Sequence, residues 1–124
     1  MSWYKIKIRK TDTDYSKYIR TKANWKCEIC GRNDIGLEAS HYFGRVNQSA
    51  RFDDRNVHCL CKTCHRKAHE PGYYYRDWLV KTYGQKWFDK LTIDAHTTGK
   101  KDYKLQAIIN KELLKSIDSL NKIN

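Results

Sequence analysis

The chain has 124 residues, 31% of them charged and 40% hydrophobic, and a formal net charge of +11. This length suits one compact domain or a small core with helical arms, and no apolar run approaches the ~18–20 residues of a membrane span. The positive charge indicates a polyanionic partner, most commonly nucleic acid, although a basic surface without a specific partner has the same composition. The first ten residues, MSWYKIKIRK, carry charges where a signal peptide would be apolar, so we expect a cytoplasmic protein.

The chain begins with a basic stretch and a short predicted helix. Residues 1–11 carry lysine and arginine without an acid, and we interpret them as an arm along a phosphate backbone or as a frayed end. Residues 12–26 predict a helix, because aspartates near its start precede Tyr15, Tyr18 and Ile19 on one face.

The middle of the chain predicts two strands and a helix. The strands cover residues 36–43 and 55–60, and a loop over 44–54 joins them. A helix is predicted from Lys62 to about Glu70, where a Pro-Gly pair ends it.

The rest of the chain is predicted to be helical. Residues 73–91 read as two short helices broken near Gly84, and residues 103–123 as an amphipathic helix that packs on the domain or on a second copy. We therefore predict an α+β fold with flanking helices around a small core. The predicted segments are a basic arm with a short helix (1–24), the core (25–92), and a loop with the C-terminal helix (93–124).

Four of the five cysteines form two Cys-x-x-Cys pairs, Cys27 with Cys30 and Cys61 with Cys64. In a chain without an export signal, this spacing favours zinc over disulfides, and a redox pair is the alternative for either motif alone. Two pairs supply four thiolates to one tetrahedral ion, so we predict a closed, structural Zn²⁺ site. Cys59 is left over, and we expect it to be a buried apolar side chain.

Three histidines lie close to these motifs in the predicted fold. His65 and His69 are four residues apart on a helix, so their rings share one face and can hold a divalent ion. The zinc site is expected to bring His41, on the first strand, opposite that pair. A neutral imidazole there can take a proton from water that attacks a phosphate. The alternative for the helical pair is two solvent-facing side chains.

Other side chains are given simpler roles. Six basic residues are candidates for contacts with neighbouring phosphates: Arg45, Arg51, Arg55, Lys62, Arg66 and Lys67. We expect His58 to be structural and His96 to lie on the surface. Trp25, Trp78 and Trp87 are expected to belong to the core rather than to a base-stacking surface.

The stretches CEIC, ASH and RNVHCLCKTCH, in this order, resemble the HNH, or ββα-metal, nucleases. The longer run EASHYFGRVNQSARFDDRNVHCLCKTCHRKAH, with YYYRDWLVKTYGQKWFDKL after it, is more similar to the NinG/Rap group of phage recombination endonucleases. The resemblance spans about residues 25–92.

This resemblance implies roles for the matching positions. His41 would be the general base, Asn56 would hold the hairpin loop in shape, and His65 and His69 would be ligands of a catalytic Mg²⁺ or Mn²⁺. The chain departs from the family pattern at two places. Ser40 stands where many members have an acidic metal ligand, and His65 stands where the NinG-like group tends to have asparagine.

We therefore expect a zinc-containing, metal-dependent endonuclease that hydrolyses DNA phosphodiester bonds. The resemblance implies branched recombination intermediates as substrates, and the cytoplasm of a bacterium or phage-infected host cell as location. The alternative is a non-catalytic zinc module that binds nucleic acid by charge and shape. A further hypothesis is a homodimer that forms through the C-terminal helix.

Overall fold

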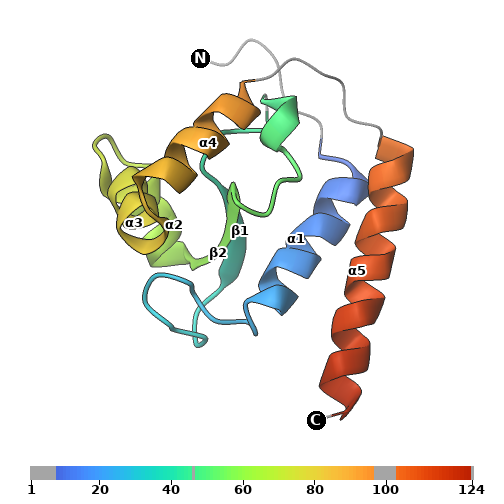
Figure 1. Ribbon diagram of the computed structural model, residues 1–124. Coiled ribbons are helices and arrows are strands. Elements are labelled where there is room, and N and C mark those ends of the chain that lie inside the picture. The colour runs from blue at the N-terminus through green and yellow to red at the C-terminus, as the bar shows by residue number, and fades with distance from the viewer. Residues whose placement is uncertain (1–7, 46, 97–102, 124) are drawn as a thin grey trace.

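The computed structural model describes residues 8–45, 47–96 and 103–123, so most of the predicted arm over 1–11 lies outside the described residues. The fold is α+β, with a two-stranded antiparallel sheet and, in the described part of the chain, five α-helices (Figure 1). The elements are α1 (Lys10–Lys22), β1 (Leu37–His41), the 3-10 turn η1 (Gln48–Ala50), β2 (Val57–Cys61), α2 (Lys62–Ala68), α3 (Tyr74–Tyr83), α4 (Gln85–Ala95) and α5 (Tyr103–Ile123).

The hairpin of β1 and β2 lies at the centre of the molecule, with α1 on one side and α2 and α3 on the other (Figure 1). Leu37 pairs with Cys61 at one end and His41 with Val57 at the other, and α2 follows β2 without a break. All five residues of β2 are buried. Because side chains alternate along a strand, the buried strand supplies apolar groups to both of its faces.

Two apolar clusters use these faces. The α1 cluster joins residues of β2 and the hairpin loop to the apolar stripe of the first helix: Tyr15, Tyr18, Ile19, Phe52, Val57 and Cys59. The α3 cluster joins the end of β2 and three of the cysteines to α3 and α4: Cys27, Leu60, Cys61, Cys64, Tyr75, Leu79 and Phe88. Burial of these side chains on both faces stabilises a hairpin that would be marginal alone in water.

A buried ion pair ties α1 to the hairpin loop. The Arg51 guanidinium donates to both carboxylate oxygens of Asp12, at 2.8 and 2.6 Å, and both side chains are almost fully buried. Burial alone would raise the pKa of Asp12, but hydrogen bonds from Arg51 and the Arg9 amide, with the charge of Arg45, lower it below 3.8. The pair therefore contributes stability at neutral pH, and this contribution is lost as the pH falls through the lowered pKa.

The C-terminal helix α5 packs along α1 (Figure 1). The side-chain amide of the buried Asn110 donates to the carbonyl oxygen of Thr11 at 3.1 Å, and Leu113 and Leu114 pack against the α1 cluster. The sequence left two placements for this helix, on its own domain or on a second copy of the chain, and the structure shows it on its own domain. The homodimer through α5 stays a prediction.

Among residues 8–45, 47–96 and 103–123, no helix combines the length and the apolar character that a membrane crossing requires.

Replacing Arg51 tests the buried ion pair. Arg51→Met should lower the free energy of unfolding by about 3–5 kcal/mol, because it leaves the Asp12 carboxylate buried without a charged partner. Urea titration of the zinc-loaded protein at pH 7 measures the change. Lys10→Ala removes an exposed ion pair to Asp14 and is the matched control, expected to cost less than about 1 kcal/mol. A similar, small effect of both substitutions would contradict the assignment.

Candidate functional site

The four cysteines of the two Cys-x-x-Cys pairs converge on one point. Their sulfur atoms all lie within 4.8 Å of one another, and Sγ of Cys30 is 3.8 Å from Sγ of Cys61. A tetrahedron of zinc–sulfur bonds of about 2.3 Å has edges of about 3.8 Å, so this spacing fits one zinc ion. It is far longer than a disulfide bond of about 2.05 Å, and all five cysteines are free thiols. The four residues can hold a structural metal such as zinc.

Both turns that carry the cysteines are shaped by backbone hydrogen bonds. In the first, Gly31 takes a left-handed φ of 79° and its amide donates to the Cys27 carbonyl at 2.8 Å. In the second, the Cys61 sulfur caps α2 by accepting from the Cys64 amide at 3.4 Å. Burial alone would raise the pKa of the Cys27 thiol, but nearby backbone amides, including that of Cys30, lower it to about 7. These amides therefore favour the thiolate that a metal requires.

The turn that carries Cys27 and Cys30 is also hydrogen-bonded to the outer edge of β2. The Glu28 amide donates to the Cys59 carbonyl at 2.8 Å, and the Glu28 carboxylate accepts from the Cys59 amide at 2.5 Å. The cysteine cluster thus joins the segment before β1, the end of β2 and the start of α2. Cys59 itself is fully buried in the α1 cluster, as predicted for a small apolar side chain.

An open pocket of about 250 Å³ lies between β1 and α2, lined by Glu38, Lys62, His65, Arg66 and His69. The His65 and His69 rings lie 4.9 Å apart between centroids. Nδ1 of His65 is 3.2 Å from the Glu38 carboxylate, and Nε2 of His69 is 3.2 Å from the Ser40 hydroxyl. The predicted helical pair therefore faces the side of β1 that carries residues 38 and 40.

The contact with Glu38 fixes the tautomer of His65. A carboxylate only accepts hydrogen bonds at neutral pH, so the proton of the neutral ring is on Nδ1 and the lone pair is on Nε2. A carboxylate in this position is the usual support of a metal-ligating histidine. Sequence reasoning missed Glu38, although its position two residues before Ser40 places it on the same strand face.

The ligand geometry differs between the two candidate metal sites. In the part of the chain that the structure describes, the four cysteines are the only group of three or more His, Cys, Asp or Glu residues whose ligand atoms lie close enough together to hold one metal ion. Around α2 the observed contacts are pairs, His65 with Glu38 and His69 with Ser40. An ion bound here would have Nε2 of His65 as a ligand and would need Nε2 of His69 to give up its contact with Ser40, and its remaining ligands would be water or a rotated side chain.

His41 lies on the other face of β1. It is 9% exposed, its Nε2 is 3.0 Å from the carbonyl oxygen of Arg51, and Arg45 and Asp12 are nearby charges. The neighbouring residue Ser40 points to His69, and adjacent strand residues point to opposite faces. The prediction that His41 faces the two helical histidines across a gap is therefore corrected.

The environment of His41 fixes both its charge and its tautomer. Burial and the positive charge of Arg45 lower its pKa to about 4, so the ring is neutral at pH 7. A carbonyl oxygen can only accept a hydrogen bond, so Nε2 of His41 carries the proton and donates to the Arg51 carbonyl. Nδ1 of His41 therefore keeps its lone pair. A neutral imidazole with a bare nitrogen is the form that can accept a proton.

Asn56 ties the two sides of the hairpin loop together. It is fully buried; its side-chain oxygen accepts from the Phe43 amide at 2.8 Å, and its nitrogen donates to the carbonyls of Phe43 and Ala50 at 2.9 and 3.1 Å. These are the contacts of a loop tether, the role that the resemblance implies. They hold the loop that carries the Arg51 carbonyl, and hence they support His41.

The predicted phosphate ligands separate into structural and exposed groups. Arg51 is 3% exposed and engaged by Asp12, so its prediction as a phosphate contact is wrong. Arg55 bridges Asp53 and Asp94, at 2.6 and 2.9 Å, and so fastens the loop to α4. Arg45 is partly buried beside Asp12. The exposed cations of the predicted set are Lys62, Arg66 and Lys67, all on α2.

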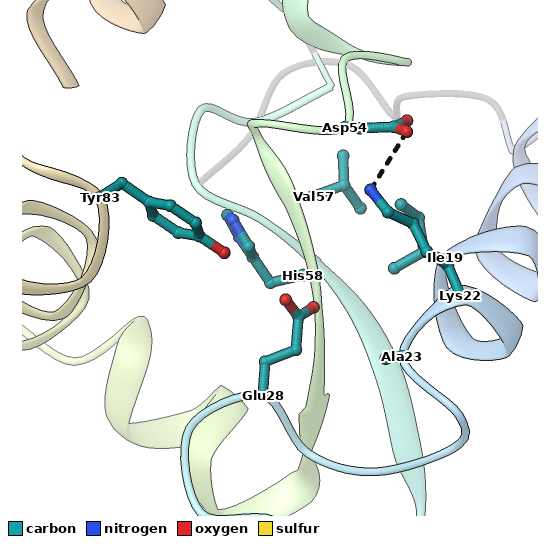
Figure 2. A pocket seen from close by; sticks show the side chains of 8 residues that line it. All are labelled: Ile19, Lys22, Ala23, Glu28, Asp54, Val57, His58 and Tyr83. Atoms are coloured by element: carbon teal, nitrogen blue, oxygen red, sulfur yellow. Dashed lines mark hydrogen bonds and ion pairs between the residues drawn. The ribbon is translucent and has the colours of Figure 1, made fainter. Parts of the chain in front are cut away.

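A second, smaller pocket of about 150 Å³ opens at the outer edge of β2 (Figure 2). Figure 2 shows the His58 ring with Glu28 and Tyr83 pointing toward it, and a Lys22–Asp54 ion pair on the other side. His58 is buried, its pKa is lowered to about 4 chiefly by burial, and its Nδ1 is within hydrogen-bond distance, 2.8 Å, of the Tyr75 hydroxyl oxygen. The contacts of His58 are those of a structural residue, as predicted.

The tryptophans do not all lie in the core. Trp78 and Trp87 pack against the α3 cluster, as predicted. Trp25 is 44% exposed, so its prediction as a core residue is wrong. His96 is exposed at the end of α4, as expected of a surface residue.

Comparison with known proteins gives one family. A family model described as "Bacteriophage Lambda NinG protein" matches residues 4–122, which is nearly the whole chain. No curated protein and no solved structure matches the chain. The chain belongs to the NinG family.

Removing one sulfur ligand tests the metal cluster. Cys61→Ala should abolish the binding of one zinc per chain and unfold the domain at 25 °C, because folding and structural zinc binding are coupled. Zinc content by elemental analysis and circular dichroism measure the two effects. Cys59→Ala removes a neighbouring buried thiol and should keep both zinc and fold. Zinc retention by the Cys61 variant would contradict the assignment.

Proposed function

We propose that this NinG-family protein is a metal-dependent endonuclease that hydrolyses phosphodiester bonds in DNA, with branched intermediates of phage recombination as its substrates. The observation that carries the proposal is the placement of two chemical functions on consecutive residues at the end of β1. Ser40 faces the histidine pair of α2, and His41 is a neutral base on the other side of the same strand end. Because His41 is the last residue of β1, DNA would reach both groups around this end of the strand and not across one of its faces.

The α2 side of the site is suited to a divalent cation and to phosphate. His65 offers Nε2 as a ligand because Glu38 holds its other nitrogen, and His69 lies beside it. A bound Mg²⁺ or Mn²⁺ would stabilise negative charge on the phosphate and on the leaving oxygen. Lys62 and Arg66 line the same pocket and are exposed, so they can neutralise phosphates of the bound strand.

The α1 side supplies the general base. In the proposed reaction, Nδ1 of His41 takes a proton from water while the water oxygen attacks phosphorus. The bond from phosphorus to the 3′ oxygen breaks and this oxygen takes a proton from solvent, which leaves a 5′-phosphate and a 3′-hydroxyl. The Arg51 carbonyl accepts a hydrogen bond from Nε2 of His41, and so it stabilises the imidazolium that forms. Arg51 is thus a positioning residue in this proposal, rather than a phosphate ligand.

The second candidate function is a zinc module that binds nucleic acid without cleaving it. The net charge of +11 and the exposed cations of α2 support this function as well. A passive binder needs neither the His65 and His69 pair beside Glu38 nor a histidine at position 41 next to Ser40, and this combination favours the nuclease. Catalysis and binding can be separated experimentally.

A plasmid-nicking assay with Mg²⁺ or Mn²⁺ tests the proposed base. The unmodified protein should nick supercoiled DNA, and His41→Ala should reduce the rate by about 10²–10⁴-fold while zinc content and DNA affinity stay unchanged. His96→Ala, at an exposed histidine outside the site, is the control and should cut normally. If the His41 variant cleaves at the original rate, another group is the base. If no protein cleaves, the binding module is favoured.

Titration of the zinc-loaded protein with Mn²⁺ tests the second ion. His65→Ala should abolish Mn²⁺ binding at this pocket, and Glu38→Gln should weaken it by about 10–100-fold, because Glu38 orients the ligand. Zinc should stay at one ion per chain in both variants. If His65→Ala lost zinc and kept Mn²⁺, the histidine would belong to the other ion.

A further inference from the structure

A groove separate from the sites above lies between the end of α1 and the start of β1. Its volume is about 450 Å³, and Arg20, Asn24, Trp25, Asn33 and Leu37 are among the residues that line it. The groove combines an exposed indole with a guanidinium and two carboxamides. This set is unlike an apolar core surface, where such polar groups would be unpaired.

The backbone that presents Trp25 is strained. Asn24 and Trp25 take left-handed φ angles of 56° and 55°, and the Trp25 amide donates to the Arg20 carbonyl at 2.9 Å. Helices commonly end with one such residue, usually glycine, but a bulky side chain in this conformation is an outlier. Strain of this kind concentrates at functional sites. Here the turn exposes the indole that a regular helical continuation would direct elsewhere.

Arg20 and Trp25 form one composite surface. The guanidinium carbon lies 4.9 Å from the indole centroid, and Nε of Arg20 donates to the Ser16 carbonyl at 3.2 Å, which limits its motion. A flat, electron-rich ring beside a cation is suited to stacking with a nucleobase. The amides of Asn24 and Asn33 offer both donors and acceptors to the edge of such a base.

The groove adjoins the pocket that contains His65, and Gly36 and Lys62 lie where the two meet. Gly36 lines the groove, and a Cβ atom on Gly36 would lie 2.8 Å from Cε of Lys62, whose side chain lines the pocket. A phosphate bound at Lys62 and a base bound at Trp25 can thus belong to neighbouring nucleotides of one strand.

We propose that Trp25 and Arg20 form a stacking site for an unpaired DNA base next to the candidate cleavage site, an inference that rests on DNA being the substrate. In a duplex both faces of each base are covered by stacking, so the indole can receive only a base that has left the helix. The site therefore selects DNA with unpaired nucleotides, as at a branch point, over a continuous duplex.

Binding of two matched DNAs tests this selection. The zinc-loaded full chain is titrated, without Mg²⁺ or Mn²⁺, into a fluorescent duplex with a three-nucleotide unpaired bulge and into a fully paired duplex of equal length. Trp25→Ala should weaken binding to the bulged DNA about 5- to 150-fold, as expected for one stacked base, and leave binding to the paired duplex unchanged. Trp25→Phe should keep most of the affinity.

Two further variants keep the test decisive. Trp25→Gly removes the ring but suits the left-handed backbone, so it should fold at least as well as the parent and show the same selective loss. Tyr73→Ala removes another exposed aromatic ring that has an arginine beside it, Arg76 at 5.5 Å, and should change neither affinity. Equal affinity of the Trp25 variants for bulged DNA, or an equal loss on both DNAs, would overturn the stacking site.

The test is independent of cleavage. The binding assay contains no Mg²⁺ or Mn²⁺, so it measures affinity and does not depend on cleavage. A protein that never nicks DNA can therefore still show the selective loss of affinity. That result would support the stacking site and leave the nuclease proposal to its own assay. If instead the protein nicks DNA and the Trp25 variants bind both DNAs as the parent does, only the stacking site is overturned.

Discussion

The convergence of four sulfur atoms is the constraint on which the rest of the structure depends. Cys30 and Cys61 are separated by 31 positions in sequence but by 3.8 Å in space. A hairpin of two strands is barely stable by itself, and both of its open ends need support. The cysteine cluster joins the segment that precedes β1 to the junction of β2 and α2, and so it fixes how α2 lies over the strands. The second ion site, the general base and the stacking site that we propose all use residues in or next to these segments.

The two faces of the hairpin have different stabilising interactions and different chemistry. On the α1 face, Arg51 has two roles: its guanidinium pairs with Asp12, and its carbonyl accepts from His41. The ion pair that attaches α1 to the loop therefore also holds in place the carbonyl that fixes the tautomer of the histidine, and Asn56 holds the loop in the required shape. On the α2 face the contacts of His65 and His69 are longer and more exposed, as the proposed exchange of a cation and a substrate requires. Stability and proposed catalysis thus share residues on one face only.

Much of this arrangement could be predicted from the sequence because it depends on local spacing. The cysteine pairs gave the metal cluster, and periodicity gave both strands and all five helices, with small shifts at their ends. The helix predicted over 12–26 stops at Lys22, because the next turn is left-handed at Asn24 and Trp25. That reversal also exposes Trp25, which composition and hydrophobicity assign to the core. Arg51 was misjudged since its partner Asp12 is 39 positions away. The directions of Ser40 and His41 were predictable, because neighbours on a strand cannot both face one helix.

The central claim is that one zinc ion is held by four thiolates. X-ray absorption at the zinc edge of the purified protein tests it most directly, because it counts the ligand atoms around the metal and measures their distances. The account predicts four sulfur ligands at about 2.3 Å and no nitrogen. A shell of sulfur mixed with nitrogen would mean that a histidine of α2 has replaced a cysteine, and it would contradict both the cluster and the separate site proposed beside it.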